Sequence, residues 1–160
     1  MTSTVADELA SIIRVAEPEF RALTEDFLRM RPAPDRWTIK EVLGHLIDSA
    51  ANNHQRFIRA QFAPMTGLIF PEYEQVEWVR CQNYNEANWT GLIDLWTAYN
   101  RHLLHVIRFI SNNDQAVSCL IGDDPPVTLQ FLIEDYVVHL KHHLRKIAER
   151  LNVNPQRFGA

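Results

Sequence analysis

The sequence predicts an all-α fold, a four-helix bundle with one long crossover loop, formed by a single domain that spans residues 1–160. Four segments repeat apolar residues at the i, i+3, i+4, i+7 spacing of amphipathic helices, and no long stretch shows the alternation of a half-buried strand. The chain has only 5 glycines, no internal repeat and no linker-like tract, so nothing divides it into two domains.

The first helix is expected at about residues 4–28, with an apolar stripe that begins at Val5 and continues to Met30. Pro18 interrupts this segment. Because proline lacks a backbone N–H and its ring crowds the preceding turn, we expect a kink or a break there. The prolines in the following "RPAPDRW" stretch prevent the helix from continuing into it.

The second helix is expected to begin at the motif "TIKE", which has the pattern of a capping box between Thr38 and Glu41. Its apolar stripe ends near Gln61. The connection that follows, residues 62–86, is long for a compact domain, and structureless loops of that length frequently form lids or walls of functional sites.

The third and fourth helices are expected at about residues 89–110 and 128–151. Between them, "VSCLI" at 117–121 is a candidate for a short extended segment. Four helices with one long crossover form a bundle, and facing helices of such bundles build metal and ligand sites from side chains that project inward.

Composition argues against several classes of function. The net charge is −4 and the basic residues are scattered among acidic ones, so we expect no nucleic acid and no membrane as a partner. No apolar run approaches the ~18–20 residues that span a bilayer. "MTSTVADELA" lacks the features of a secretory signal, and Cys81 and Cys119 form no disulfide framework, so a cytoplasmic location is expected.

The last predicted helix carries three histidines in "VVHLKHHL". With Leu140 at the centre of its buried face and about 100° per residue, His139 and His143 lie on one flank. Side chains four residues apart meet across one helical turn, so these two rings can approach one ion. His142 falls nearly opposite and is expected to face solvent or a partner surface.

His45 occupies a similar flank of the second predicted helix. If these two helices pack as neighbours, His45 meets His139 and His143. Three neutral imidazoles leave coordination positions open, as catalytic metal sites do. Imidazole binds zinc, nickel, iron and copper, so ligand type alone does not select the metal. The same pattern also fits histidines that are merely hydrogen-bonded at the edge of the core.

The remaining histidines are weaker candidates. His54 and His102 lie near the edges of the apolar stripes, and His105 lies beside Arg101 and Arg108, whose charge would repel a metal ion. None of the three is predicted as a ligand.

The motifs and their order resemble the DinB/YfiT-like superfamily. The helix start "WTIKE" at 37–41, the His-Leu pair at 45–46 and His-x-x-x-His at 139–143 match its motifs, and the likeness spans nearly the whole chain. The resemblance implies an up-down-down-up bundle, frequently a homodimer. It also implies a divalent metal ion, with zinc or nickel as the leading candidates, on the same three residues, His45, His139 and His143.

The superfamily includes metal-dependent transferases acting on low-molecular-weight thiols such as bacillithiol and mycothiol, together with a hydrolase-like activity. The resemblance therefore implies an S-transferase with a small-molecule substrate. A metal-dependent hydrolase of the same family remains an alternative. So does a non-catalytic dimeric module that binds a metal or small molecule, with Phe131 and Val138 at the dimer contact.

The sequence assigns no catalytic general base. Asp48 and Asp135, each about one turn from a predicted ligand, either orient the imidazoles or are solvated helix charges. Arg56 either receives a substrate carboxylate or is a surface cation. Three aromatic side chains are expected to pack at the end of the bundle rather than stack on a substrate: Trp37, Trp78 and Tyr84.

Overall fold

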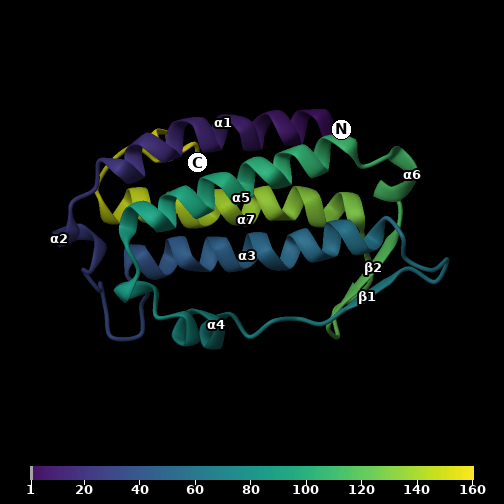
Figure 1. The fold of residues 1–160 in the computed structure, drawn as a ribbon, viewed down its shortest axis with the longest axis horizontal. Helices are drawn as coiled ribbons and strands as arrows, with labels where there is room; N and C mark the ends of the chain where they lie inside the picture. Colours follow the sequence, from purple (N-terminus) through teal and green to yellow (C-terminus); the bar gives the residue numbers. More distant parts are fainter. Residues whose placement is uncertain (1) are drawn as a thin grey trace.

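The computed structural model describes residues 2–160, with side chains from Thr4 onward, and shows a four-helix bundle (Figure 1). The long helices are α1 (Thr2–Arg21), α3 (Ile39–Ala60), α5 (Trp89–Phe109) and α7 (Leu129–Arg150). α1 and α7 run in one direction and α3 and α5 in the other, which is the up-down-down-up order. Each helix packs against two others, and α3 lies between α5 and α7.

The starts of three long helices are fixed by side-chain caps. Thr38 accepts a hydrogen bond from the Glu41 N–H, and the Glu41 carboxylate accepts one from the Thr38 N–H, so the predicted capping box is present. At α5 and α7 the side chains of Asn88 and Thr128 accept hydrogen bonds from the backbone N–H groups of Gly91 and Phe131, without the reciprocal bond of a capping box. Each cap satisfies a backbone donor that the first helical turn leaves unpaired, which is why these three helices begin where the sequence predicts.

The first helix differs from its prediction. α1 continues through Pro18 to Arg21, because the Pro18 carbonyl still accepts from the Ala22 N–H at 3.1 Å and only one intrahelical bond is lost. The chain then turns and forms a separate four-residue helix, α2 (Glu25–Leu28). The predicted apolar stripe therefore ends early, and Met30 is exposed.

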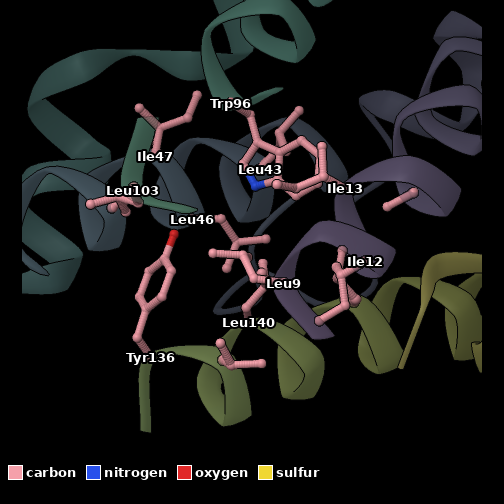
Figure 2. Close-up of a cluster of buried hydrophobic side chains, with 14 of the residues drawn as sticks. Leu9, Ile12, Ile13, Leu43, Leu46, Ile47, Trp96, Leu103, Tyr136 and Leu140 are labelled. Carbon is pink, nitrogen blue, oxygen red and sulfur yellow. The ribbon is translucent and has the colours of Figure 1, made fainter. Parts of the chain in front are cut away.

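The core is formed by side chains from all four long helices (Figure 2). Leu9 of α1, Leu46 of α3, Trp96 of α5 and Leu140 of α7 are each almost fully buried. Tyr136 also lies in this core, where its hydroxyl donates a 2.6 Å hydrogen bond to the Asn100 side chain. The buried phenol is thus paired, as a polar group in an apolar interior must be.

The crossover between α3 and α5 is not a structureless loop. It contains β1 (Leu68–Phe70), α4 (Gln75–Gln82) and the 3-10 helix η1 (Tyr84–Glu86), and it runs back along α3 (Figure 1). β1 pairs in parallel with β2 (Ser118–Ile121), the extended segment expected from the sequence, and β2 pairs antiparallel with β3 (Val127–Thr128). Two short helices complete the fold: α6 (Asn112–Gln115) and η2 (Pro155–Phe158).

Together with two of the long helices, the crossover covers α3 on most of its circumference. α5, α7, α4 and η1 all pack against it, so even Lys40 is only 2% exposed. The Lys40 ammonium group donates to the Asn85 carbonyl of η1 at 3.0 Å, which compensates for the burial of its charge. Because α3 is covered in this way, side chains on its flanks are part of the interior.

Among the described helices, none is long and apolar enough to cross a membrane.

Candidate metal centre

The packing of α3 against α7 brings together the three histidines that the sequence singled out. The Nε2 atoms of His45 and His139 lie 3.1 Å apart. One nitrogen from each ring of His45, His139 and His143 lies within 4.8 Å of the others, the only such group of three or more metal-ligating side chains in the described part of the chain. The ring centroids of the three are between 4.6 and 5.0 Å apart.

His45 is completely buried, whereas the helical wheel placed it at the edge of the buried face. The Trp37 ring packs against it, with the ring centroids 4.8 Å apart. Trp37 is itself held by Arg150, whose Nη1 donates to the Trp37 carbonyl at 2.6 Å. The loop before α3 and the last turn of α7 therefore form one wall of the histidine cluster.

The three imidazoles are held in the neutral form. Burial, followed by the neighbouring charge of His139, lowers the pKa of His45 to about 4. Burial, with the charges of the other histidines and Lys146, lowers the pKa of His143 to about 3. Burial also lowers the pKa of His139, against an opposing effect of Asp135. Neutral imidazole is the form that binds a metal ion, so near neutral pH no proton has to leave first.

The spacing of the ring nitrogens fits a metal ion. Two imidazoles on a tetrahedral zinc ion with Zn–N bonds of ~2.0–2.1 Å have their nitrogens about 3.3 Å apart. The 3.1 Å between the Nε2 atoms of His45 and His139 is close to that value, and one nitrogen of each of the three rings lies within 4.8 Å of the others. The Nδ1 atoms of His45 and His143 are buried with no hydrogen-bond partner among the described residues. Packing thus positions the rings of His45 and His143, whereas the Nδ1 atom of His139 lies 3.5 Å from the Ser49 hydroxyl. The ring nitrogens that converge between the helices are placed to bind a cation.

A pocket of about 620 Å³ opens beside the cluster. His143 and Trp37 line it, together with Val76 of the crossover, so a small molecule in the pocket would reach one of the three rings. Several charged side chains contribute to the same walls: Asp35, Arg36, Lys146, Glu149 and Arg150.

Asp48 lies one turn after His45, but it neither contacts a histidine nor faces solvent. It is 1% exposed and accepts hydrogen bonds from the Tyr84 hydroxyl, at 2.6 Å, and from the Gln82 amide. Burial raises the pKa of Asp48 to about 6, although the two hydrogen bonds oppose the shift. The expectation of a solvated charge is wrong for Asp48, because the crossover covers it; its carboxylate anchors the crossover to α3.

Asp135 and Arg56 lie on the other side of the cluster. Asp135 is exposed and, among the described residues, hydrogen-bonds to none of the three histidines. Arg56 is half-buried, its Nε has no hydrogen-bond partner among the described residues, and burial lowers its pKa. Both line a second pocket of about 260 Å³, with Glu72 and Tyr73 of the crossover. Arg56 is therefore more than a surface cation, because it is half-buried and lines this pocket.

The aromatic candidates divide into three cases. Trp37 contacts the histidine cluster and lines its pocket, so it is placed for substrate contact as well as for packing. Trp78 is partly exposed and packs edge-on against Tyr73, away from the cluster. Tyr84 is buried over Gly44, and a Cβ at Gly44 would overlap its ring. Sequence reasoning missed this contact, for which a glycine inside the "LGHL" helix was the signal.

The other histidines lie where the helical wheels place them or nearby. His142 is exposed, as predicted. His54 and His102 contact each other across α3 and α5, on the far side of α3 from the cluster.

Comparisons with known proteins match this architecture. The family model of the DinB superfamily matches residues 9–147. Among solved structures, the chain is similar to YfiT from Bacillus subtilis, with a TM-score of 0.81 and 18% sequence identity, over 96% of this chain and 89% of that one. YfiT is described as a probable metal-dependent hydrolase with an unusual four-helix bundle topology. A comparison with curated protein sequences found no match.

Proposed function

The chain belongs to the DinB superfamily, and on that premise we propose that it is a divalent-metal-dependent enzyme that transfers a low-molecular-weight thiol of the bacillithiol type to an electrophile. His45, His139 and His143 would hold the metal ion, with zinc or nickel as the leading candidates. The observation that carries the proposal is the convergence of three neutral imidazoles, one buried and two half-buried, beside an open pocket.

The number of protein ligands, three, distinguishes this proposed metal site from a structural zinc site. Structural zinc sites are closed by four protein ligands, whereas catalytic sites retain a position for substrate or water. In the described part of the chain no fourth histidine, cysteine or carboxylate joins the group. Bound at these rings, a divalent ion would supply Lewis acidity that favours the deprotonated form of a thiol or of water.

The surroundings of the cluster favour a thiol as the nucleophile. No carboxylate of residues 2–160 hydrogen-bonds to the three rings, and the nearest buried one, Asp48, is engaged by Tyr84 and Gln82. A reaction that needs a general base would lack an obvious one here. A thiol is acidic enough that coordination alone generates its thiolate.

The pocket indicates which substrate groups fit. Arg36, Lys146 and Arg150 line it, and burial and the charge of Arg36 lower the pKa of Arg150. Arg150 and Lys146 have no carboxylate within ion-pair distance among the described residues. If the thiol substrate carries a carboxylate, this group would relieve the repulsion between the guanidinium groups of Arg36 and Arg150. The indole of Trp37 would cover the apolar part of the substrate.

A metal-dependent hydrolase is the second candidate. It is favoured by the structural similarity to YfiT, which is described as a probable metal-dependent hydrolase. In that case the same three histidines would hold the metal ion and water would take the place of the thiol.

We further propose that the protein acts as a homodimer. On α7, Phe131 is 50% and Val138 is 64% exposed, and their apolar side chains would be covered in a dimer. Sedimentation velocity on the wild type and a Val138→Glu variant tests this, and a monomer at all concentrations would contradict it.

Zinc- or nickel-loaded protein should be assayed with bacillithiol, mycothiol and glutathione against monobromobimane. In this reaction a C–S bond forms, the C–Br bond breaks, and bromide and the thiol proton are released. We expect turnover that EDTA abolishes, that His143→Ala lacks and that His142→Ala retains. Turnover of p-nitrophenyl esters alone would favour the hydrolase, and the absence of both activities would reject the enzymatic proposal.

A further inference from the structure

We propose a second metal site, formed by His54 of α3 and His102 of α5, which binds a divalent transition-metal ion more weakly than the three-histidine cluster. It is independent of the proposed enzymatic function. His54 follows His45 by nine residues, which at about 100° per residue is half a turn around α3. The two sites therefore lie on opposite sides of that helix, one at the contact with α7 and the other at the contact with α5.

The two rings are already in contact. The centroids of His54 and His102 lie 4.9 Å apart with the ring planes at 84°. One ring comes from each of two packed helices, so the backbones of α3 and α5 hold the two side chains at this separation. The two imidazoles would form a bidentate site, and water would fill the other coordination positions of the ion.

His54 also has the support that metal-binding histidines usually have. Its Nδ1 lies 3.3 Å from the Tyr99 hydroxyl, on the same helix as His102. A hydrogen bond at one ring nitrogen orients the ring and leaves the other nitrogen to face the ion. Burial and the neighbouring His102 lower the pKa of His54, so this ring too favours the neutral form.

Nearby positive charge does not prevent binding. The sequence places Arg101 and Arg108 beside His105, one turn from His102, but in the structure both arginines pair with acidic residues of α1. Arg101 forms an ion pair with Glu17 at 3.0 Å, and Arg108 lies 3.6 Å from Asp7. The cationic surface that argued against a metal ion in the sequence is thus neutralised from a neighbouring helix.

Two imidazoles and water define the chemistry of the ligand. Imidazole suits zinc, nickel and copper, whereas magnesium and calcium prefer oxygen ligands and are not expected to bind. His105 stacks on His102 with the ring centroids 6.4 Å apart, and no third ligand lies close enough to complete a group of three in the described residues. The site should therefore exchange its ion readily.

The test is a calorimetric titration of zinc chloride into metal-free protein. The wild type should show two classes of sites, and His54→Gln and His102→Ala should each lose only the weaker one. His142→Ala, which removes another exposed histidine, should retain both. His102 is exposed, so its replacement should not prevent folding, and a melting curve for each variant verifies this.

A variant that lacks the cluster separates the two sites. His139→Ala should lose the tighter class and keep the weaker one, and zinc should still raise its melting temperature, because an ion that joins α3 and α5 binds only the folded state. The proposal is overturned if the wild type shows no weaker class, or if that class persists in both His54→Gln and His102→Ala. A wild type that shows only the weaker class would leave this proposal intact while rejecting the three-histidine centre proposed above.

Discussion

The two histidine groups on α3 use the same side chain in different surroundings. At His45 the crossover, the loop before α3 and α7 cover the helix, and the ring is completely buried. At His54, one half-turn around, the helix meets α5 at the surface, and His102 is exposed. Burial therefore separates a group of three imidazoles that are held neutral from a more exposed pair that, in our proposal, would share its ion with solvent.

The difference arises from chain connectivity rather than from the helices themselves. The up-down-down-up order makes the chain return along α3 between Ala60 and Trp89. The returning segment is tied to α3 by Tyr84 and Gln82, which donate to Asp48, and by Asn85, which donates to Glu41. A bundle with short connections would leave the flank that carries His45 at the surface.

The largest expected effect is the loss of a ligand from the cluster. His139→Ala should weaken the tighter zinc binding at least ~100-fold. The substitution removes one of the three coordinating nitrogens, and the two remaining imidazoles hold the ion less tightly. His102→Ala should leave this affinity unchanged. Competition with a chromogenic chelator measures the zinc affinity of both variants. If the two substitutions weakened the tighter binding equally, the distinction between the three-histidine cluster and the His54–His102 pair would be lost.

The stability of the metal-free protein should fall in acid because of the buried rings. The pKa of His45 is lowered from 6.5 to about 4, so below pH 6.5 the unfolded chain binds a proton that the folded one does not. The contribution of His45 is complete above pH 6.5 and is lost as the pH falls toward 4. The loss amounts to about 3 kcal/mol in the free energy of unfolding.

Urea denaturation at pH 7.5 and pH 4.5 measures this loss. Asp48 acts in the opposite sense, since its pKa is raised to about 6, so the informative quantity is the difference between wild type and His45→Asn at each pH. The difference in the free energy of unfolding between wild type and His45→Asn should be smaller at pH 4.5 than at pH 7.5. The His102→Asn variant, changed at an exposed position, should show the same pH dependence as the wild type. A gap that is independent of pH would contradict the buried neutral state of His45.

The support that the crossover gives to the cluster can be removed at Gly44. Alanine there would overlap the Tyr84 ring, and we expect a cost of about 2 kcal/mol in the free energy of unfolding, together with weaker zinc binding at the cluster. Gly91→Ala is the matched control, because its Cβ would meet only Asn88 at 3.6 Å and a helix favours alanine. A Gly44→Ala protein as stable as Gly91→Ala would refute this contact.

The smallest effect is expected at the pair formed by half-buried His54 and exposed His102. Tyr99→Phe removes the hydroxyl that orients His54 and should weaken the second zinc site by about tenfold, without a change at the cluster. The same calorimetric titration resolves the two classes. If the weaker binding is unaffected, the hydrogen bond to Tyr99 does not orient the ring.

The sequence predicted what depends on local pattern. Apolar periodicity and the Thr38 capping box located α3, α5 and α7, and helical wheels selected His45, His139 and His143 and rejected His142. The helix positions and the flank that each histidine occupies are set by side chains a few residues apart on one helix, so the sequence contains them without knowledge of the tertiary contacts. The meeting of His45 with His139 and His143 also required α3 to pack against α7, which the sequence left as a condition.

The sequence did not predict what depends on the crossover. Asp48 is buried under Tyr84, which follows it by 36 positions in the sequence, and the same tyrosine ring contacts Gly44. Both contacts thus join residues that are far apart in the sequence but adjacent in space. The sequence also placed the end of the first helix near residue 28, whereas α1 ends at Arg21 and a separate helix, α2, follows it. Long-range packing decided each of these cases.

The most direct test of the metal centre is a crystal structure of zinc-loaded protein with anomalous diffraction data collected at the zinc absorption edge. We expect one strong peak between α3 and α7, from a zinc ion about 2.0–2.1 Å from one nitrogen each of His45, His139 and His143, with its remaining position facing the pocket lined by Trp37. Fully zinc-loaded crystals with no peak at this position, or with a peak held by only one of the three rings, would contradict this expectation.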